Sequence, residues 1–166
     1  FSQLYEMLYR DMYRSALYTL GNRDDAENVV NETALDAYAG ISRLRDGSAF
    51  RSWIFRILIN KCNRVLREYS DRRRYESDES DAEPDIGVRD TDRSIENVEN
   101  KAVVEKAFSV LNKEDRQIIT LFIYGEYDSK EIASIMKMNR NTVRSRYKRS
   151  LAKMREYLSS GGEMYE

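Results

Sequence analysis

The chain has 166 residues, of which 41% are hydrophobic and 34% are charged, and its formal net charge is −1. It contains no histidine and a single cysteine, Cys62, so it has neither a disulfide framework nor a cysteine zinc site, and it lacks the commonest general base. No apolar run approaches the roughly 18 residues that would cross a bilayer. We therefore expect a cytoplasmic, soluble protein of one or two small domains, without membrane insertion, catalytic residues or a metal site. Phe1 in place of methionine indicates that the numbering starts inside a longer native chain.

Charge is distributed along the chain in three blocks. Ten basic residues stand against three acidic ones between positions 43 and 74, whereas ten acids stand against two arginines between 76 and 100. Residues 139–155 are basic again and contain no carboxylate. This alternation is unusual for one homogeneous domain and indicates two basic units separated by an acidic segment.

Two helices are predicted at the beginning of the chain. Apolar residues recur every four positions across 4–20, which is typical of one helix face, and Gly21 ends the pattern. Asp24 and Glu27 are expected to open the second helix with a capping box. Its predicted buried side consists of Val30, Ala34, Ala37, Tyr38 and Ile41.

A long helix with one apolar and one basic face is predicted next. A turn at 45–47 precedes it, and Ser48 is the candidate N-cap. Its apolar face is formed by Phe50, Ile54, Ile57, Leu58, Cys62, Val65 and Tyr69. Its other surface presents Arg51, Arg56, Asn60, Asn63, Arg64 and Arg67, and the helix ends in three arginines. Trp53 is expected in the core rather than as a stacking surface for a base.

A linker is predicted between Tyr75 and Arg93, where Ser, Asp and Glu dominate and the only proline occurs. Low hydrophobicity with high charge buries too little surface to offset the entropy of ordering. About 19 extended residues reach roughly 60–70 Å. Two basic modules tethered in this way can therefore touch separate sites on one DNA duplex.

Helical patterns continue in the second half. One covers 94–111, and Asn112 is the expected N-cap of the next, strongly apolar helix, which Gly125 ends. No stretch alternates with period two for long enough to form a sheet. The predicted fold class is therefore all-α, with two small helical bundles joined by a flexible acidic linker.

The last two predicted helices form a helix-turn-helix. Asp128 and Glu131 make a capping-box pattern, and Asn139 is a good N-cap for the longer final helix. The expected buried stripe of that helix is Val143, Tyr147, Leu151, Met154 and Leu158. The opposite face carries Arg140, Arg144, Arg146, Lys148, Arg149, Lys153 and Arg155. An uninterrupted cationic face on such a helix indicates a nucleic-acid partner.

Two pairs of segments resemble bacterial extracytoplasmic-function (ECF) sigma factors. Residues 21–33 (GNRDDAENVVNET) and 50–57 (FRSWIFRI) are similar to the second conserved region of that family. Residues 130–133 (KEIA) and 141–146 (NTVRSR) are similar to its fourth region. The two regions occur in the family's order and together cover nearly the whole chain.

The resemblance implies a dissociable initiation subunit of RNA polymerase with three parts. Residues 1–74 would form the region 2 domain, which docks on core polymerase and recognises and opens the minus-ten promoter element. Residues 75–93 would be the acidic flexible linker. Residues 94–160 would form the region 4 domain, whose helix-turn-helix reads the minus-thirty-five element in the major groove. The implied partners are core RNA polymerase, promoter DNA and an anti-sigma factor, with no cofactor and no small-molecule substrate.

The resemblance also assigns residues to three binding surfaces. The implied polymerase-binding residues are Asp24, Glu27, Asn31 and Glu32. The implied minus-ten residues are Arg45, Asp46, Gly47, Ser48, Asn60, Asn63 and Arg64. The implied minus-thirty-five residues are Asn141, Thr142, Arg144, Ser145, Lys148 and Arg149. Arginine side chains suit bidentate contacts to guanine, and backbone amides at a helix start suit a phosphate.

Other classes of protein remain as alternatives. An autonomous LuxR-type helix-turn-helix regulator shares the motifs of the second half, but it carries a domain with strands ahead of them, and the first half here has no strand pattern. A nuclease holding magnesium through carboxylates needs a scaffold that the Ser- and Asp-rich linker does not offer. A pure interaction adaptor leaves the two cationic helices unexplained. Run-off transcription with core polymerase separates a sigma factor from an autonomous regulator.

Overall fold

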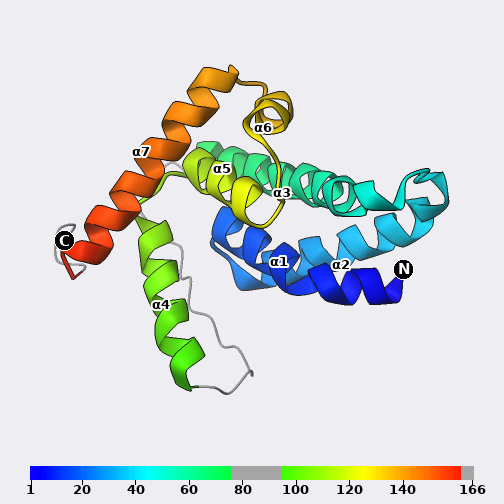
Figure 1. The fold of residues 1–166 in the computed structure, drawn as a ribbon, viewed down its shortest axis with the longest axis horizontal. Coiled ribbons are helices and arrows are strands. Elements are labelled where there is room, and N and C mark those ends of the chain that lie inside the picture. Colours follow the sequence, from blue (N-terminus) through cyan, green and yellow to red (C-terminus); the bar gives the residue numbers. More distant parts are fainter. Residues whose placement is uncertain (76–94, 162–166) are drawn as a thin grey trace.

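The computed structural model describes residues 1–75 and 102–161, and the backbone alone of 95–101. The first range contains α1 (Ser2–Leu20), α2 (Arg23–Gly40), the short 3-10 helices η1 (Ile41–Arg43) and η2 (Gly47–Ala49), and α3 (Phe50–Tyr75). The second contains α4 (Ile95–Ser109), α5 (Lys113–Ile123), α6 (Ser129–Met136) and α7 (Arg140–Ser159). Neither range contains a strand, which confirms the all-α prediction there (Figure 1). The acidic stretch 76–94, on which the predicted linker falls, lies outside the described residues.

The first three helices pack pairwise into one bundle (Figure 1). The four-residue apolar repeat of α1 places Met12 and Ala16 in the core, where both are fully buried. Val30 of α2 and Ile54 and Leu58 of α3 complete its centre. Trp53 packs against this core, as expected, and lies so close to Gly40 that a Cβ there would be 3.2 Å from the indole ring.

The ends of these helices correct two of the predicted caps. Gly21 adopts the left-handed conformation after α1, as a glycine stop should. Asn22, however, is the N-cap of α2 and accepts a hydrogen bond from the Asp25 amide, so the predicted capping box of Asp24 and Glu27 is wrong. Ser48 is likewise not a cap. It lies inside η2, which Asp46 caps, and α3 starts at Phe50.

The second half follows its predicted pattern closely. Asn112 caps α5 by accepting from the Asp115 amide. Asp128 and Glu131 form both bonds of the predicted capping box of α6. Lys137 then turns the chain in a left-handed conformation, and Asn139 caps α7 by accepting from the Asn141 amide. The α6–α7 pair is thus the expected helix-turn-helix (Figure 1).

Some residues of the predicted apolar faces are not buried. Tyr38, predicted on the buried side of α2, is 69% exposed, and Leu158 at the end of the α7 stripe is 47% exposed. Val143 is fully buried, whereas Tyr147, Leu151 and Met154 are partly buried. The last turn of α7 therefore extends past the core that holds its beginning.

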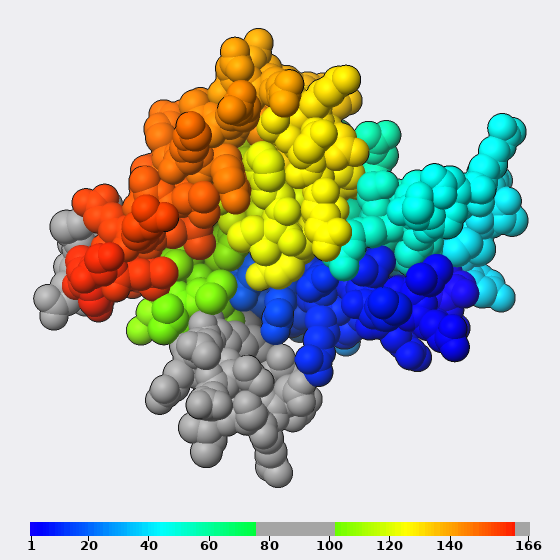
Figure 2. All heavy atoms as spheres, viewed as in Figure 1, coloured from blue at the N-terminus to red at the C-terminus, as the bar shows by residue number. Residues whose placement is uncertain are grey.

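The two halves pack directly against each other. Helix α5 lies on α1, and one continuous cluster of buried side chains joins α1–α3 to α5–α7. Ile118, Leu121 and Ile132 belong to that cluster, and each is fully buried. In the space-filling view, residues of α5 and α6 (yellow) lie against α1 (blue) and α3 (cyan to green) (Figure 2).

Candidate nucleic-acid and polymerase interfaces

The beginning of α7 presents a fixed, exposed basic surface. Buried Val143 anchors this part of the helix, and Arg140 Nε donates to Ser129 Oγ at 3.0 Å, which ties α7 to α6. All six residues predicted to face the minus-thirty-five element are exposed: Asn141, Thr142, Arg144, Ser145, Lys148 and Arg149. The helix-turn-helix thus offers its second helix to solvent, which is the geometry required to enter a major groove.

Within this surface the polar groups differ in their availability. The Asn141 amide donates to Asn139 Oδ1 at 2.8 Å and Ser145 Oγ donates to the Thr142 carbonyl at 3.0 Å, so both groups are engaged by the protein. Among the described residues, no carboxylate pairs with Arg144, Lys148 or Arg149. Their spacing of four and five positions places these three cations on one side of the helix.

Arg146 does not belong to the free cationic face that the sequence suggested. Its Nε donates to Asp115 Oδ1 at 2.7 Å, its Nη1 pairs with Glu114, and its side chain is only 20% exposed. Arg146 therefore fastens α7 to the beginning of α5. Helical spacing alone does not reveal this pairing, because its partners lie about thirty residues earlier in the chain.

The turn before α3 is an exposed loop with an ordered tip. All four of its predicted minus-ten residues, Arg45 to Ser48, are exposed. Asp46 Oδ1 accepts from the Ser48 side chain at 2.7 Å and from the Ser48 amide at 2.9 Å. These two hydrogen bonds hold the pKa of the Asp46 carboxyl below its usual value.

The other predicted minus-ten residues lie farther along α3. Asn60 is ten residues after Phe50, the first residue of α3, a rise of about 15 Å at 1.5 Å per residue, so the turn and this face are two separate patches. Asn60 is exposed. Asn63 is partly buried and accepts a hydrogen bond from Gln117 Nε2 of α5 at 2.9 Å. Arg64 is paired with two acids, Glu32 and Glu68.

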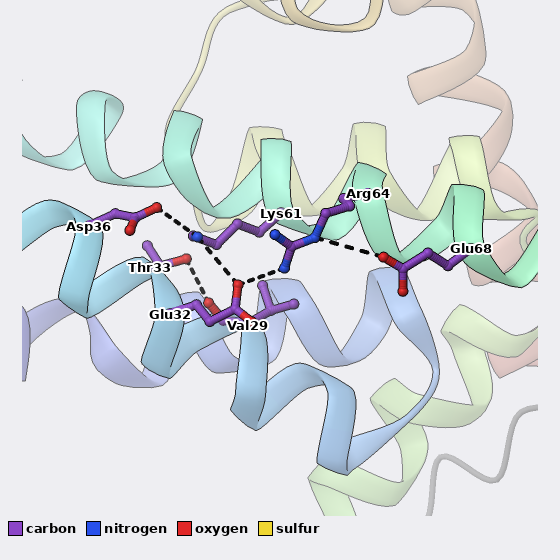
Figure 3. Close-up of polar contacts among 7 residues, drawn as sticks. All are labelled: Val29, Glu32, Thr33, Asp36, Lys61, Arg64 and Glu68. Carbon is purple, nitrogen blue, oxygen red and sulfur yellow. Dashed lines mark hydrogen bonds and ion pairs between the residues drawn. The ribbon is translucent and has the colours of Figure 1, made fainter.

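The predicted polymerase-docking residues occupy α2. Asp24, Glu27 and Asn31 are exposed. Glu32 instead faces α3, where its Oε2 lies 2.6 Å from Arg64 Nη2 and 3.3 Å from Lys61 Nζ (Figure 3). The hydrogen bond from Arg64 is the main reason that the pKa of Glu32 is lowered. Two residues assigned to different partners are thus in direct contact.

The sequence patterns did not identify two residues that lie at these surfaces, Lys61 and Gln117. Lys61 bridges Glu32 and Asp36, with its Nζ 2.6 Å from Asp36 Oδ2 (Figure 3). Gln117 of α5 donates a hydrogen bond from its side-chain amide to Asn63 Oδ1. Glu32 and Asp36 are four positions apart on one face of α2, which was a usable signal for a basic partner such as Lys61. Nothing local in the sequence pairs Gln117 with α3.

The described residues contain no group of acids and cysteine arranged to hold a metal ion. None of the helices in the same part of the chain is long and apolar enough to cross a membrane.

Comparison with known proteins agrees with this organisation. The family description "Sigma-70 region 2" matches residues 4–74, and "Sigma-70, region 4" matches residues 101–154. The ECF sigma-E factor of Salmonella typhimurium is 31% identical over 74% of this chain and 68% of its own length. The ECF sigma factor SigM of Mycobacterium tuberculosis is 27% identical over 97% of this chain and 80% of its own length.

A solved structure shares the fold. The sigma factor RpoE of Bartonella quintana, crystallised with the anti-sigma factor NepR, superposes with a TM-score of 0.73 at 22% identity and covers 96% of both chains. Two exposed helical surfaces, one on each half, and the two matched regions define a transcription initiation factor that binds DNA. The chain belongs to the ECF family of RNA polymerase sigma factors.

This membership gives the protein its function. It directs core RNA polymerase to promoters, where transcription begins. The alternative of an autonomous LuxR-type regulator is not supported, because the first half matches sigma region 2 and its described residues contain no strand.

Proposed function

We propose that the exposed beginning of α7 reads the minus-thirty-five element and that the turn before α3 together with Asn60, Asn63 and Arg64 reads the minus-ten element. Arg144, Lys148 and Arg149 would contact base edges or phosphates in the major groove, where a guanidinium suits guanine. Asn141 and Thr142 at the start of α7 would lie near the phosphates. The observation that carries this assignment is the exposure of these cations on a helix anchored by buried Val143.

The polymerase-binding surface is assigned to the outer face of α2. Asp24, Glu27 and Asn31 are exposed on it, and Glu32 borders it beside Lys61 and Arg64. A surface of this kind suits a basic partner segment, because carboxylates and amides dominate it. In this assignment the domains are residues 1–74 and 94–160, with the acidic segment 75–93 as the connection.

The remaining parts of the proposal concern partners and setting. The protein acts as a binding factor in the cytoplasm and performs no covalent chemistry of its own. Strand opening then depends on capture of unstacked bases by the α3 surface. An anti-sigma factor is the expected regulator, since the structurally similar RpoE was solved with one.

Run-off transcription with purified core polymerase tests this function. Addition of the protein should produce discrete, promoter-dependent start sites that core polymerase alone does not give. Sequencing these starts defines both elements on the same templates. DNA binding by the protein without any change in the products of core polymerase would contradict the proposal.

The surface assignments are tested by two variants in the same assay. Glu27→Lys should reduce co-purification with core polymerase, because it reverses one exposed charge of α2. Lys148→Ala should leave that co-purification intact and reduce promoter-dependent starts. A loss of core binding by Lys148→Ala, with promoter selection unchanged, would show that the two surfaces are assigned the wrong way round.

A further inference from the structure

A chain of ion pairs joins the outer side of α2 to the exposed side of α3 (Figure 3). It begins at Asp36, whose Oδ2 lies 2.6 Å from Lys61 Nζ, and Lys61 Nζ is also 3.3 Å from Glu32 Oε2. The same Glu32 oxygen lies 2.6 Å from Arg64 Nη2, and Arg64 Nε lies 3.9 Å from Glu68 Oε1. Glu32 therefore links both cations through one oxygen.

The two cations of this chain differ in how much of each reaches solvent. The Lys61 side chain is only 12% exposed, so it mainly holds α3 to α2. The Arg64 side chain is 49% exposed. Its two ion pairs engage Nη2 and Nε, and Nη1 takes part in neither of them. Arg64 is thus fixed through one edge of its guanidinium, and Nη1 is left to meet a ligand.

Arg64 lies in a row of exposed polar side chains along α3. Arg56, Asn60 and Arg67 belong to the same row, because successive members are three or four positions apart. In the part of the chain that the structure describes, no carboxylate pairs with Arg56 or Arg67. The row therefore has unpaired cations at its ends and a charge-balanced arginine between them. Phosphate contacts position a protein on DNA, whereas contacts to bases specify the sequence.

Glu32 controls both the orientation and the charge of Arg64. The hydrogen bond from Arg64 lowers the pKa of the Glu32 carboxyl, so this group stays charged at neutral pH. While the pair is intact, the guanidinium is already ordered before DNA arrives, and its charge is balanced. Without the carboxylate, the same side chain would sample several orientations and would attract any phosphate.

We propose that Glu32 is a positioning residue for recognition of the minus-ten element: it holds Arg64 in one orientation toward DNA and withholds the charge of Arg64 from phosphates. This inference rests on the minus-ten surface proposed above. It gives Glu32 a role in promoter selectivity that is separate from the polymerase-binding role implied by the family resemblance. A polymerase contact through Glu32 would affect all promoters equally, whereas a positioning role affects the choice between them.

A double-mutant cycle between Glu32 and Arg64 tests this inference. The full-length wild type, Glu32→Gln, Arg64→Ala and the double variant are each added in excess over core polymerase, so that core binding does not limit the product. Selectivity is the ratio of run-off product from a promoter mapped with the wild type to that from the same promoter altered at the minus-ten element. Asp36→Asn is the matched control, because it removes a neighbouring acid that contacts Lys61 and not Arg64.

The expected result is a loss of selectivity that depends on Arg64. Glu32→Gln and Arg64→Ala should each lower the ratio by at least about fivefold, the lower end of what one fixed base contact supplies. When Arg64 is already alanine, adding Glu32→Gln should lower the ratio by less than about twofold. Asp36→Asn should stay within about twofold of the wild type. An unchanged ratio for Glu32→Gln, or an equal loss in both backgrounds, would overturn the inference.

Salt dependence of DNA binding gives a second readout, which applies even if Arg64→Ala leaves too little product to measure. The free full-length protein is titrated with a short duplex that lacks promoter sequence, at several salt concentrations. Release of Arg64 by Glu32→Gln should raise this non-specific affinity and steepen the log–log salt slope by about 0.9, the effect of one added phosphate contact. Structural damage would not raise affinity. An unchanged or shallower slope would overturn the inference.

Failure of the inference and failure of the proposed function give different results. The wild type alone tests the function, and a lack of promoter-dependent starts with the wild type would contradict it. Normal starts with the wild type, together with an unchanged ratio and salt slope for Glu32→Gln, would contradict only the positioning role of Glu32.

Discussion

Neighbouring cations on α7 have different physical roles although the sequence presents them as one face. Arg146 is partly buried between α7 and α5 and pairs with two acids, whereas Arg149 is exposed. A partly buried ion pair with good hydrogen bonds stabilises the fold, because removal of one partner leaves the other charge without its counter-charge and hydrogen bonds. An exposed arginine contributes little to folding and remains available to DNA.

These roles predict opposite outcomes for a matched pair of substitutions. Arg146→Ala should lower the free energy of unfolding by about 1–3 kcal/mol, since Asp115 loses its partner. Arg149→Ala should change that free energy by less than about 0.5 kcal/mol and weaken transcription from promoters by roughly tenfold. Chemical denaturation and run-off assays measure the two effects. A destabilised Arg149→Ala with normal promoter activity would show that the exposed arginine is structural.

The atoms packed around Gly125 leave no room for a side chain at this position. A Cβ at this position would lie 2.8 Å from the Tyr127 ring and 2.9 Å from the Leu121 carbonyl oxygen. Gly125→Ala should therefore cost about 1–3 kcal/mol of stability through overpacking against Tyr127 and Leu121. Gly47→Ala is the matched control, because nothing lies within 4 Å of its added Cβ. Equal melting temperatures for the two variants would show that Tyr127 moves aside freely.

At the scale of the elements, capping residues decide where the helices of the second half begin. Asp128 accepts from the amides of Lys130 and Glu131 at 2.7 and 2.9 Å, and the Glu131 side chain accepts from the Asp128 amide. The hydrogen bond from the Glu131 amide, followed by that from the Lys130 amide, lowers the pKa of the Asp128 carboxyl in the folded protein. The start of the helix-turn-helix is therefore sensitive to acid.

The sign of this pH dependence follows from linkage. Because the folded pKa of Asp128 is lowered, its contribution to stability is complete above the unfolded pKa of about 4 and is lost as the pH falls through the lower folded value. Asp128→Asn keeps a capping oxygen without a titrating group. The stability advantage of the wild type over this variant should therefore shrink from about pH 6 to about pH 2 in urea titrations. A constant difference across that range would contradict the assignment, and Glu156→Gln on α7 controls for charge.

Local signals in the sequence were sufficient for most elements and insufficient for some of their ends. The capping box of α6 and the Asn caps of α5 and α7 involve residues two or three positions apart, so their pattern is visible directly. At the start of α2, both Asn22 and Asp24 are acceptable N-cap residues by type, and the folded chain uses Asn22. The exposure of Tyr38 was missed because periodicity places a residue on a face but does not say whether another helix covers it.

At the scale of the whole molecule, the sequence predicted two basic helical units but left open how they meet. Contacts between the two halves join Thr19 to Thr120 and Ser52 to Tyr127, and no local pattern specifies such distant pairs. The same holds within the candidate sites. Helical spacing identified the exposed cations Arg144, Lys148 and Arg149 of α7. The pairing of Arg64 with Glu32 and of Asn63 with Gln117 depends instead on contacts between elements.

Transcription from matched templates tests most directly whether two separate helices recognise the two promoter elements. A promoter mapped with the wild type is altered at the upstream element, at the downstream element, or at neither. Each template is transcribed with the wild type, with Lys148→Ala/Arg149→Ala on α7, and with Asn60→Ala on α3. These variants keep the buried anchors of both helices intact.

The α7 variant should lose activity on the intact promoter and on the downstream-altered one, but it should lose nothing further once the upstream element is altered. Asn60→Ala should show the reverse pattern. If the α7 variant instead loses the same factor on all three templates, its surface does not read the upstream element, which would contradict recognition of the two elements by two separate helices.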